Sequence, residues 1–134
     1  MEWTPDKVKE NVRFGGKPEG RVKMRLAYIF ITPLSHRILS TMILPQLESG
    51  RHGAEIIGMM FFVDNTYFLT KDDELAKRLQ KIHENTGMLL MACDQCAYER
   101  NIDKKLVHGA RIGCFPDLYK GLGDAGGVDQ VITF

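Results

Sequence analysis

The sequence lacks the features that are typical of membrane proteins and of nucleic-acid-binding proteins. Its 18 basic and 17 acidic residues leave a formal net charge of +1, too small an excess to attract a phosphate backbone or an anionic bilayer. No apolar stretch approaches the roughly 20 residues that a membrane-spanning helix needs. The N-terminus is too charged to form a signal peptide. We therefore predict a cytoplasmic protein that binds neither nucleic acid nor a membrane.

Cysteine is scarce, with three residues in 134. In a reducing cytosol, a closely spaced cysteine pair is more often catalytic, redox-active or metal-binding than a structural disulfide. The chain also lacks internal repeats, low-complexity tracts and a glycine-rich nucleotide loop behind a strand. Its length and its hydrophobic fraction of 44% fit one ordinary globular domain.

Apolar runs and helical patterns alternate along the chain. Residues 26–32 are apolar almost throughout, as expected of a strand buried on both faces of a parallel sheet. Further strands are predicted at residues 54–63, 88–92 and 130–134, and residues 67–69 form either a short extra strand or part of a pocket wall. This alternation predicts an α/β fold, a single three-layer domain of about five mostly parallel strands with helices on both faces.

Helices are predicted between these strands. One begins at Ser35 and runs toward Gly50, and Pro45 within it predicts a kink or an early end because proline lacks the backbone N–H. A second begins at residues 70–73, which resemble a capping box, and a third begins near Pro116.

The remaining segments are predicted to be irregular. Residues 1–24 are polar and mixed in charge, so we interpret them as an N-terminal extension ahead of a domain at residues 25–134. Residues 109–113 are predicted to form a loop, and the glycine-rich residues 121–127 a flexible turn.

The most informative motif is Cys93-Asp94-Gln95-Cys96, which directly follows the apolar run of residues 88–92. The order predicts a strand, a thiol pair and a helix. Cys93 then faces unpaired N–H groups and the positive end of the helix dipole, a position that favours its thiolate. Catalytic groups gather beyond the carboxyl ends of strands in open α/β sheets, so Cys93 and Cys96 are the candidate catalytic residues.

Other interpretations of the cysteines stay open. Cys93, Cys96, His108 and Cys114 together are the ligand types of a Cys₃His zinc site, which would make the protein a noncatalytic zinc-binding or assembly subunit. A C-x-x-C pair at a helix start is also typical of dithiol oxidoreductases, although two strand–helix units precede it here. Free cysteines are often small packing residues, and Cys114 is either that or a third thiol. We assign no metal ligand and no cofactor.

The segment from Met91 to Ile102 resembles the cysteine segment of the DsrE-like family, sulfur-relay proteins that include the DsrE/DsrF and TusD types. In that family an apolar strand leads to a cysteine and then to a short helix that ends in Arg-Gly and an aliphatic residue. Asn101 stands here in place of the glycine, and asparagine is the residue that best tolerates a left-handed cap after glycine. The resemblance covers roughly residues 25–134, including the segments at residues 26–31, 61–64 and 128–134.

The resemblance implies a sulfurtransferase-type carrier. Cys93 matches the family's sulfur-accepting cysteine, and Cys96 matches a second cysteine that only some branches have. Cys93 would hold a persulfide taken from a donor protein and pass it to an acceptor protein. Cys96 would attack the inner sulfur, releasing sulfide and leaving a disulfide. The family also implies a homo-oligomer, either a trimer or a hexamer.

Overall fold

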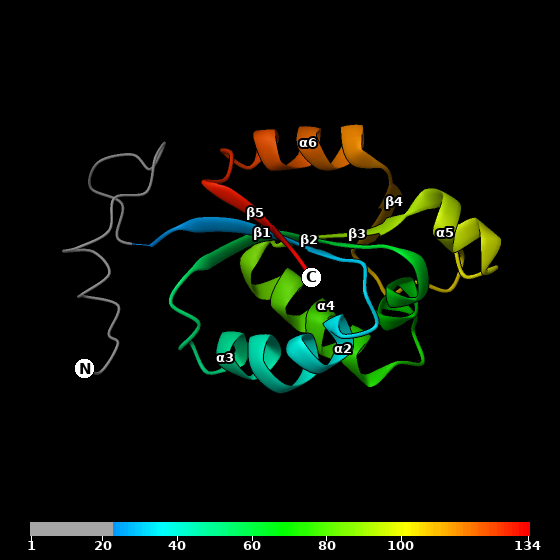
Figure 1. Cartoon of the computed structure of the whole chain (residues 1–134), viewed down its shortest axis with the longest axis horizontal. Coiled ribbons are helices and arrows are strands. Elements are labelled where there is room, and N and C mark those ends of the chain that lie inside the picture. The colour runs from blue at the N-terminus through cyan, green and yellow to red at the C-terminus, as the bar shows by residue number, and fades with distance from the viewer. Residues whose placement is uncertain (1–22) are drawn as a thin grey trace.

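A five-stranded parallel sheet forms the centre of the computed structural model, which describes residues 23–134 (Figure 1). The strand order is β4-β3-β2-β1-β5, and every neighbouring pair is parallel. The predicted α/β fold with a mostly parallel sheet is confirmed. The strands are β1 (Arg25–Phe30), β2 (Glu55–Phe61), β3 (Leu89–Cys93), β4 (Ala110–Gly113) and β5 (Gln130–Thr133).

Helices cover both faces of the sheet, with α2, α3 and α4 on one side and α6 on the other (Figure 1). The chain steps outward from β1 to β4, and α6 then returns it across the opposite face to β5. This arrangement keeps the crossover connections right-handed. The helices are α2 (Ser35–Ile38), the π-helical turn η1 (Leu39–Ile43), α3 (Leu44–Glu48), the 3₁₀ helix η2 (Val63–Leu69), α4 (Glu74–Thr86), α5 (Asp94–Glu99) and α6 (Phe115–Asp124).

Strand β3 is buried along its whole length, and its side chains alternate between two hydrophobic clusters. Leu90 and Ala92 pack on the α4 side, whereas Leu89, Met91 and Cys93 pack on the α6 side. Because consecutive strand residues point to opposite faces, the register of β3 fixes the face on which Cys93 lies. The thiol of Cys93 therefore belongs to the core between the sheet and α6.

The helix that carries Pro45 continues to Glu48 instead of ending early. The widened turn of η1 lies directly ahead of it, and Pro45 occupies the first turn of α3. The N–H groups of a helix's first turn have no partner within that helix, so proline, which lacks this N–H, costs no hydrogen bond there. The π-helical turn thus lets the chain keep a helical path through a residue that normally interrupts one.

Two segments predicted to be irregular are regular. Residues 110–113 form β4, a short edge strand that pairs with β3, where we expected a loop. Gly121 and Gly123 lie inside α6, where we expected a flexible turn. A Cβ on Gly121 would come within 2.9 Å of Leu89 Cδ2, so the glycine allows α6 to approach the sheet closely.

The segment after β2 also differs from the prediction. Residues 67–69 do not form the short extra strand that was one of the two expectations, but the end of the 3₁₀ helix η2. The following helix, α4, is capped by Asp73, whose carboxylate accepts a hydrogen bond of 2.8 Å from the Leu75 N–H. Thr70 lies too early to be the cap, since α4 begins only at Glu74.

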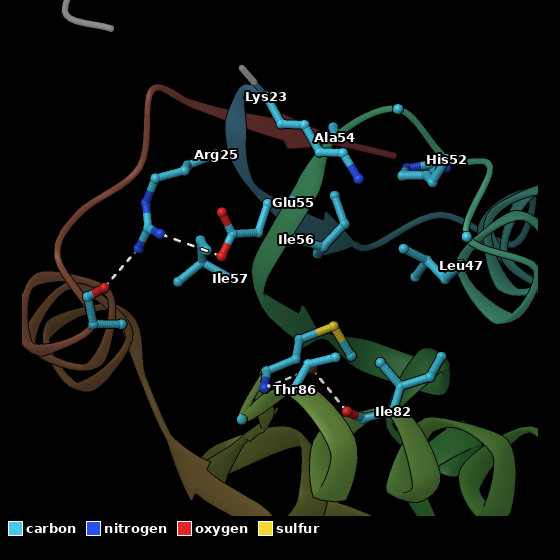
Figure 2. A pocket seen from close by; sticks show the side chains of 15 residues that line it. Lys23, Arg25, Leu47, His52, Ala54, Glu55, Ile56, Ile57, Ile82 and Thr86 are labelled. Carbon is cyan, nitrogen blue, oxygen red and sulfur yellow. Dashed lines mark hydrogen bonds and ion pairs between the residues drawn. The ribbon is translucent and has the colours of Figure 1, made fainter. Parts of the chain in front are cut away.

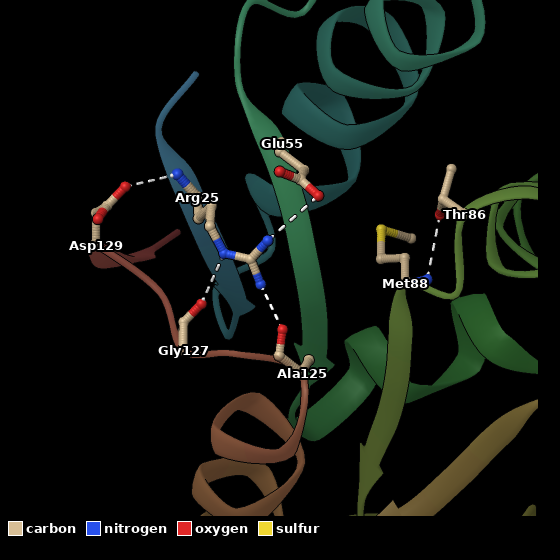
Figure 3. A network of polar contacts seen from close by, with 7 residues as sticks. All are labelled: Arg25, Glu55, Thr86, Met88, Ala125, Gly127 and Asp129. Atoms are coloured by element: carbon tan, nitrogen blue, oxygen red, sulfur yellow. Dashed lines mark hydrogen bonds and ion pairs between the residues drawn. The ribbon is translucent and has the colours of Figure 1, made fainter. Parts of the chain in front are cut away.

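Arg25 holds the chain between α6 and β5 against the start of β1 (Figure 3). Its guanidinium donates to the carbonyl oxygens of Ala125 at 2.6 Å and Gly127 at 3.0 Å, and lies 3.4 Å from the Glu55 carboxylate. Its backbone N–H donates to Asp129 at 2.8 Å. These contacts fix the entry into β5.

No helix within residues 23–134 combines the length and the apolar character needed to cross a bilayer. The predicted N-terminal extension, residues 1–24, lies almost wholly outside the described residues.

Candidate functional site at the carboxyl edge of the sheet

All three cysteines lie at the carboxyl edge of the sheet. Cys93 is the last residue of β3, and Cys96 lies in α5, which extends beyond the ends of β3 and β4 (Figure 1). Cys114 follows Gly113, the residue of β4 that pairs with Cys93. All three are free thiols. The predicted strand, thiol pair and helix therefore occur in that order.

Cys93 is the N-cap of α5 and is almost completely buried, with 7% of its surface exposed. Its side chain packs in the α6-side cluster with Met91 and Leu118. Cys96 is partly buried and packs against the same cluster. The two thiols of the motif therefore lie side by side, one inside the core and one at its border.

The pKa of Cys93 is shifted in the direction opposite to the one expected, since the sequence predicted a position that favours the thiolate. Burial raises the pKa of Cys93 to about 11, and the neighbouring Cys96 thiol and Asp94 carboxylate add to the increase. The backbone N–H of Cys96 acts in the opposite direction but does not reverse the shift. The loss of hydration therefore outweighs the N–H groups at the start of a six-residue helix.

Cys96 has a hydrogen-bond donor that the sequence did not reveal. The backbone N–H of Val63, just beyond β2, donates to Cys96 Sγ at 3.2 Å. Val63 has a φ of 50°, a left-handed conformation that is rare for a β-branched residue. The buried Thr66 hydroxyl donates to the Val63 carbonyl oxygen at 2.7 Å and helps to hold this conformation.

Arg100 joins α5 to η2 beside Cys96. Its Nε lies 3.0 Å from the Asp64 carboxylate, and its terminal nitrogen donates to the Cys96 carbonyl oxygen at 3.1 Å. The pKa of Arg100 is raised, mainly by the hydrogen bond to Asp64 and also by the charge of Cys96. The guanidinium is thus held beside Cys96 by its contact with that residue's carbonyl oxygen.

The four residues of the possible zinc site do not come together. His108 precedes β4, whereas Cys114 follows it, so roughly 13 Å of strand separates them. Within residues 23–134, no group of three or more His, Cys, Asp or Glu side chains is placed to hold a metal ion. The Cys114 N–H instead donates to the Asp117 carboxylate at 2.8 Å, which caps α6.

A cavity of about 400 Å³ lies at the opposite edge of the sheet, near the start of β2 (Figure 2). Its walls are mainly apolar, and the polar side chains in them are largely engaged. Arg25 is held as described above, and His52 bonds to Tyr28 Oη at 2.6 Å and to Gln46 Oε1 at 2.9 Å. This cavity is separate from the thiols, which lie at the other ends of the strands.

Neither a known family model nor a curated protein sequence matches the chain. Solved structures do match it in shape, and two of them match over 84% of its length. They are the ychN protein from E. coli, with a TM-score of 0.58 and 15% identity, and MTH1491 from Methanobacterium thermoautotrophicum, a protein of unknown function, with 0.59 and 14%. The matches cover 99% and 100% of those chains. Both are DsrE-like fold proteins.

The chain has the DsrE-like fold. The fold expected from the cysteine segment is therefore confirmed. At identities of 15% and 14%, the likeness concerns the fold and not the role of any cysteine.

The two thiols could be identified from the sequence, but their neighbours Val63, Asp64 and Arg100 could not. Val63 ends an apolar run, and nothing in its residue type signals a positive φ. The pairing of Asp64 with Arg100 joins residues that are 36 positions apart.

Proposed function

We propose that this protein is a sulfur carrier in which the Cys93–Cys96 pair accepts a sulfur atom as a persulfide and passes it to another thiol. The observation that supports this most strongly is the pair of free thiols at the carboxyl edge of a DsrE-like sheet. The cysteine segment also resembles that of the DsrE-like family, whose members include sulfur-relay proteins.

The chemistry needs only thiols and a persulfide donor. A cysteine thiolate attacks the outer sulfur of the donor persulfide, the donor's S–S bond breaks, and the donor leaves as a thiolate. An acceptor thiol then removes the same sulfur and restores the dithiol. The sum of the two steps moves one sulfur atom and consumes no oxidant or reductant.

The partial burial of the pair suits a carrier. Apolar surroundings keep water and stray thiols away from a bound persulfide, while Cys96 remains reachable from outside. A persulfide next to a second thiol has another fate, because attack on its inner sulfur releases sulfide and forms a Cys93–Cys96 disulfide. A dithiol oxidoreductase would use that disulfide, so the fate of the sulfur distinguishes the two functions.

We propose donor and acceptor proteins as partners and the cytoplasm as the location, because free thiols stay reduced there. We also propose residues 25–134 as the domain and a homo-oligomer, trimeric or hexameric, as the assembly. Large apolar side chains support an interface near the carboxyl edge, since Tyr98 on α5 is 58% exposed and Tyr119 on α6 is 63% exposed.

A transfer assay tests the carrier function. The protein is loaded with glutathione persulfide that carries radiolabelled outer sulfur, separated from the donor, and mixed with a thiol acceptor. We expect the label to move to the acceptor and the protein to return to its dithiol form. The matched control is the variant Cys93→Ser/Cys96→Ser, which should hold no label. Release of all label as sulfide, with a disulfide left on the protein, would favour an oxidoreductase instead.

A further inference from the structure

The two thiols of the pair differ in how readily each can act as a nucleophile. Cys93 is 7% exposed and lies among apolar side chains. Burial raises the pKa of Cys93 to about 11, so its thiol stays protonated at neutral pH. A donor protein would also have to reach a sulfur that is covered on most sides. Cys96 is less buried and stands nearer to solvent.

Cys96 Sγ has a donor whose direction is fixed by the backbone. The Val63 N–H donates to this sulfur from 3.2 Å, and the left-handed φ of 50° at the same residue turns the chain away from β2 into η2. The Thr66 hydroxyl and the Phe62 N–H, which donates to the Phe30 carbonyl oxygen at 2.9 Å, anchor the chain on either side. A strained conformation persists only where its surroundings hold it, so the N–H remains aimed at the sulfur. A hydrogen bond to a thiolate is stronger than one to a thiol.

A positive charge lies on the same side of Cys96. Arg100 is 18% exposed in its side chain, and its contacts with Asp64 and with the Cys96 carbonyl oxygen hold it in place. Asp64 is 87% exposed, so solvent weakens its opposing charge. Cys96 therefore has both a fixed N–H donor and a nearby guanidinium, whereas the thiol and carboxylate next to Cys93 both disfavour its thiolate.

We infer that, in the sulfur carrier proposed above, sulfur enters at Cys96 and then moves to Cys93. The inference rests on that proposed function. In the first step the Cys96 thiolate attacks the outer sulfur of the donor persulfide, and the donor leaves as a thiolate with the electron pair of the broken S–S bond. In the second step Cys93 attacks the same outer sulfur, its proton passes to the Cys96 sulfur, and Cys96 returns to a thiol. In the first step the donor persulfide is reduced to a thiol as Cys96 becomes a persulfide, and the second step moves that sulfur within the protein, so no further oxidant or reductant is needed.

This order gives each thiol a task that fits its surroundings. The accessible Cys96 meets the donor, and the buried Cys93 stores the sulfur away from water. The Val63 N–H donates to the sulfur that attacks the donor and later leaves, and Arg100 is held on the carbonyl oxygen of the same residue. Val63 and Arg100 thus act as positioning residues, and the two cysteines as the catalytic residues.

Time-resolved trapping tests the order. The full chain is mixed with glutathione persulfide, quenched with excess iodoacetamide at increasing times and digested with trypsin. Cleavage after Lys81 and Arg100 leaves both thiols on the peptide of residues 82–100, and fragment ions that separate Cys93 from Cys96 locate the extra sulfur. Cys114 falls on another peptide.

We expect the sulfur on Cys96 at the earliest times and on Cys93 later. The variant Cys93→Ser should still take up sulfur and should keep it on Cys96, because the second transfer step is removed. The variant Cys96→Ser should load at least about tenfold more slowly, because Cys93, the thiol of the pair that remains, lacks the hydrogen bond that Cys96 receives from Val63. Cys114→Ser should load like wild type.

Two results would overturn the order while leaving the carrier function intact. One is sulfur on Cys93 before any appears on Cys96, a result that the wild-type time course gives without any variant. The other is a Cys96→Ser variant that loads as fast as wild type. A wild-type protein that takes up no sulfur at all would instead overturn the carrier function, and this order with it.

Discussion

The left-handed backbone of Val63 predicts an inverted preference between glycine and alanine. Val63→Ala and Val63→Gly both remove the branched side chain, but alanine keeps the Cβ that a φ of 50° disfavours. The left-handed conformation costs a residue with a Cβ about 1–2 kcal/mol. Glycine avoids this cost, but it raises the conformational entropy of the unfolded chain, which lowers the free energy of unfolding by about 0.4–1 kcal/mol. We therefore expect Val63→Gly to be about 1 kcal/mol more stable than Val63→Ala.

Urea unfolding followed by circular dichroism measures the difference, which corresponds to roughly 4 °C in Tm for a chain of this size. Lys77, exposed at the end of the first turn of α4, supplies the control. There Lys77→Gly should be about 1 kcal/mol less stable than Lys77→Ala, because glycine is the poorer helix former. If Val63→Ala proved as stable as Val63→Gly, the backbone at Val63 would not be strained, and the fixed donor to Cys96 would lose its physical basis.

Three further predictions concern stability. Gly109→Ala should lower the free energy of unfolding more than Gly53→Ala does. Both glycines have a positive φ, of 92° and 80°, but only at Gly109 would the new Cβ collide with a side chain, 2.4 Å from His83 Cδ2. Equal losses of stability in urea unfolding would contradict this. Burial lowers the pKa of His52, so the unfolded chain takes up a proton there at a higher pH than the folded chain does. Wild type should lose stability as the pH falls below about 6.5, and His52→Gln should lose less over the same range. Asp73→Ala should destabilise α4 by about 1 kcal/mol through the lost cap, and an unchanged midpoint in thermal unfolding would show that the cap contributes nothing.

The long apolar strands could be predicted because burial on both faces leaves a continuous hydrophobic signal. This holds for β1, β2 and β3, which form the middle of the sheet. β4 was missed because an edge strand of four residues, with Arg111 exposed, carries almost no such signal. Gly121 was assigned to a turn because glycine usually ends helices, whereas here the close approach of α6 to Leu89 requires it.

The two thiols of the candidate site could be predicted from the sequence, but the residues that contact them could not. The C-x-x-C spacing and the preceding apolar run placed Cys93 at the end of a strand. Asn101 has a φ of 55°, which agrees with the left-handed cap expected at that residue. The raised pKa of Cys93 depends on side chains from α6 and on Cys96, contacts that no local pattern records. The same applies to the donor from Val63, which arises from the path of the chain after β2.

Native electrospray mass spectrometry tests the central claim most directly. The wild-type protein and the variant Cys93→Ser/Cys96→Ser are measured before and after incubation with a persulfide donor. A sulfur carrier gains one sulfur atom per chain, and the variant gains none. A bound zinc ion in the wild-type protein, with no uptake of sulfur, would contradict the carrier function and make the cysteines metal ligands.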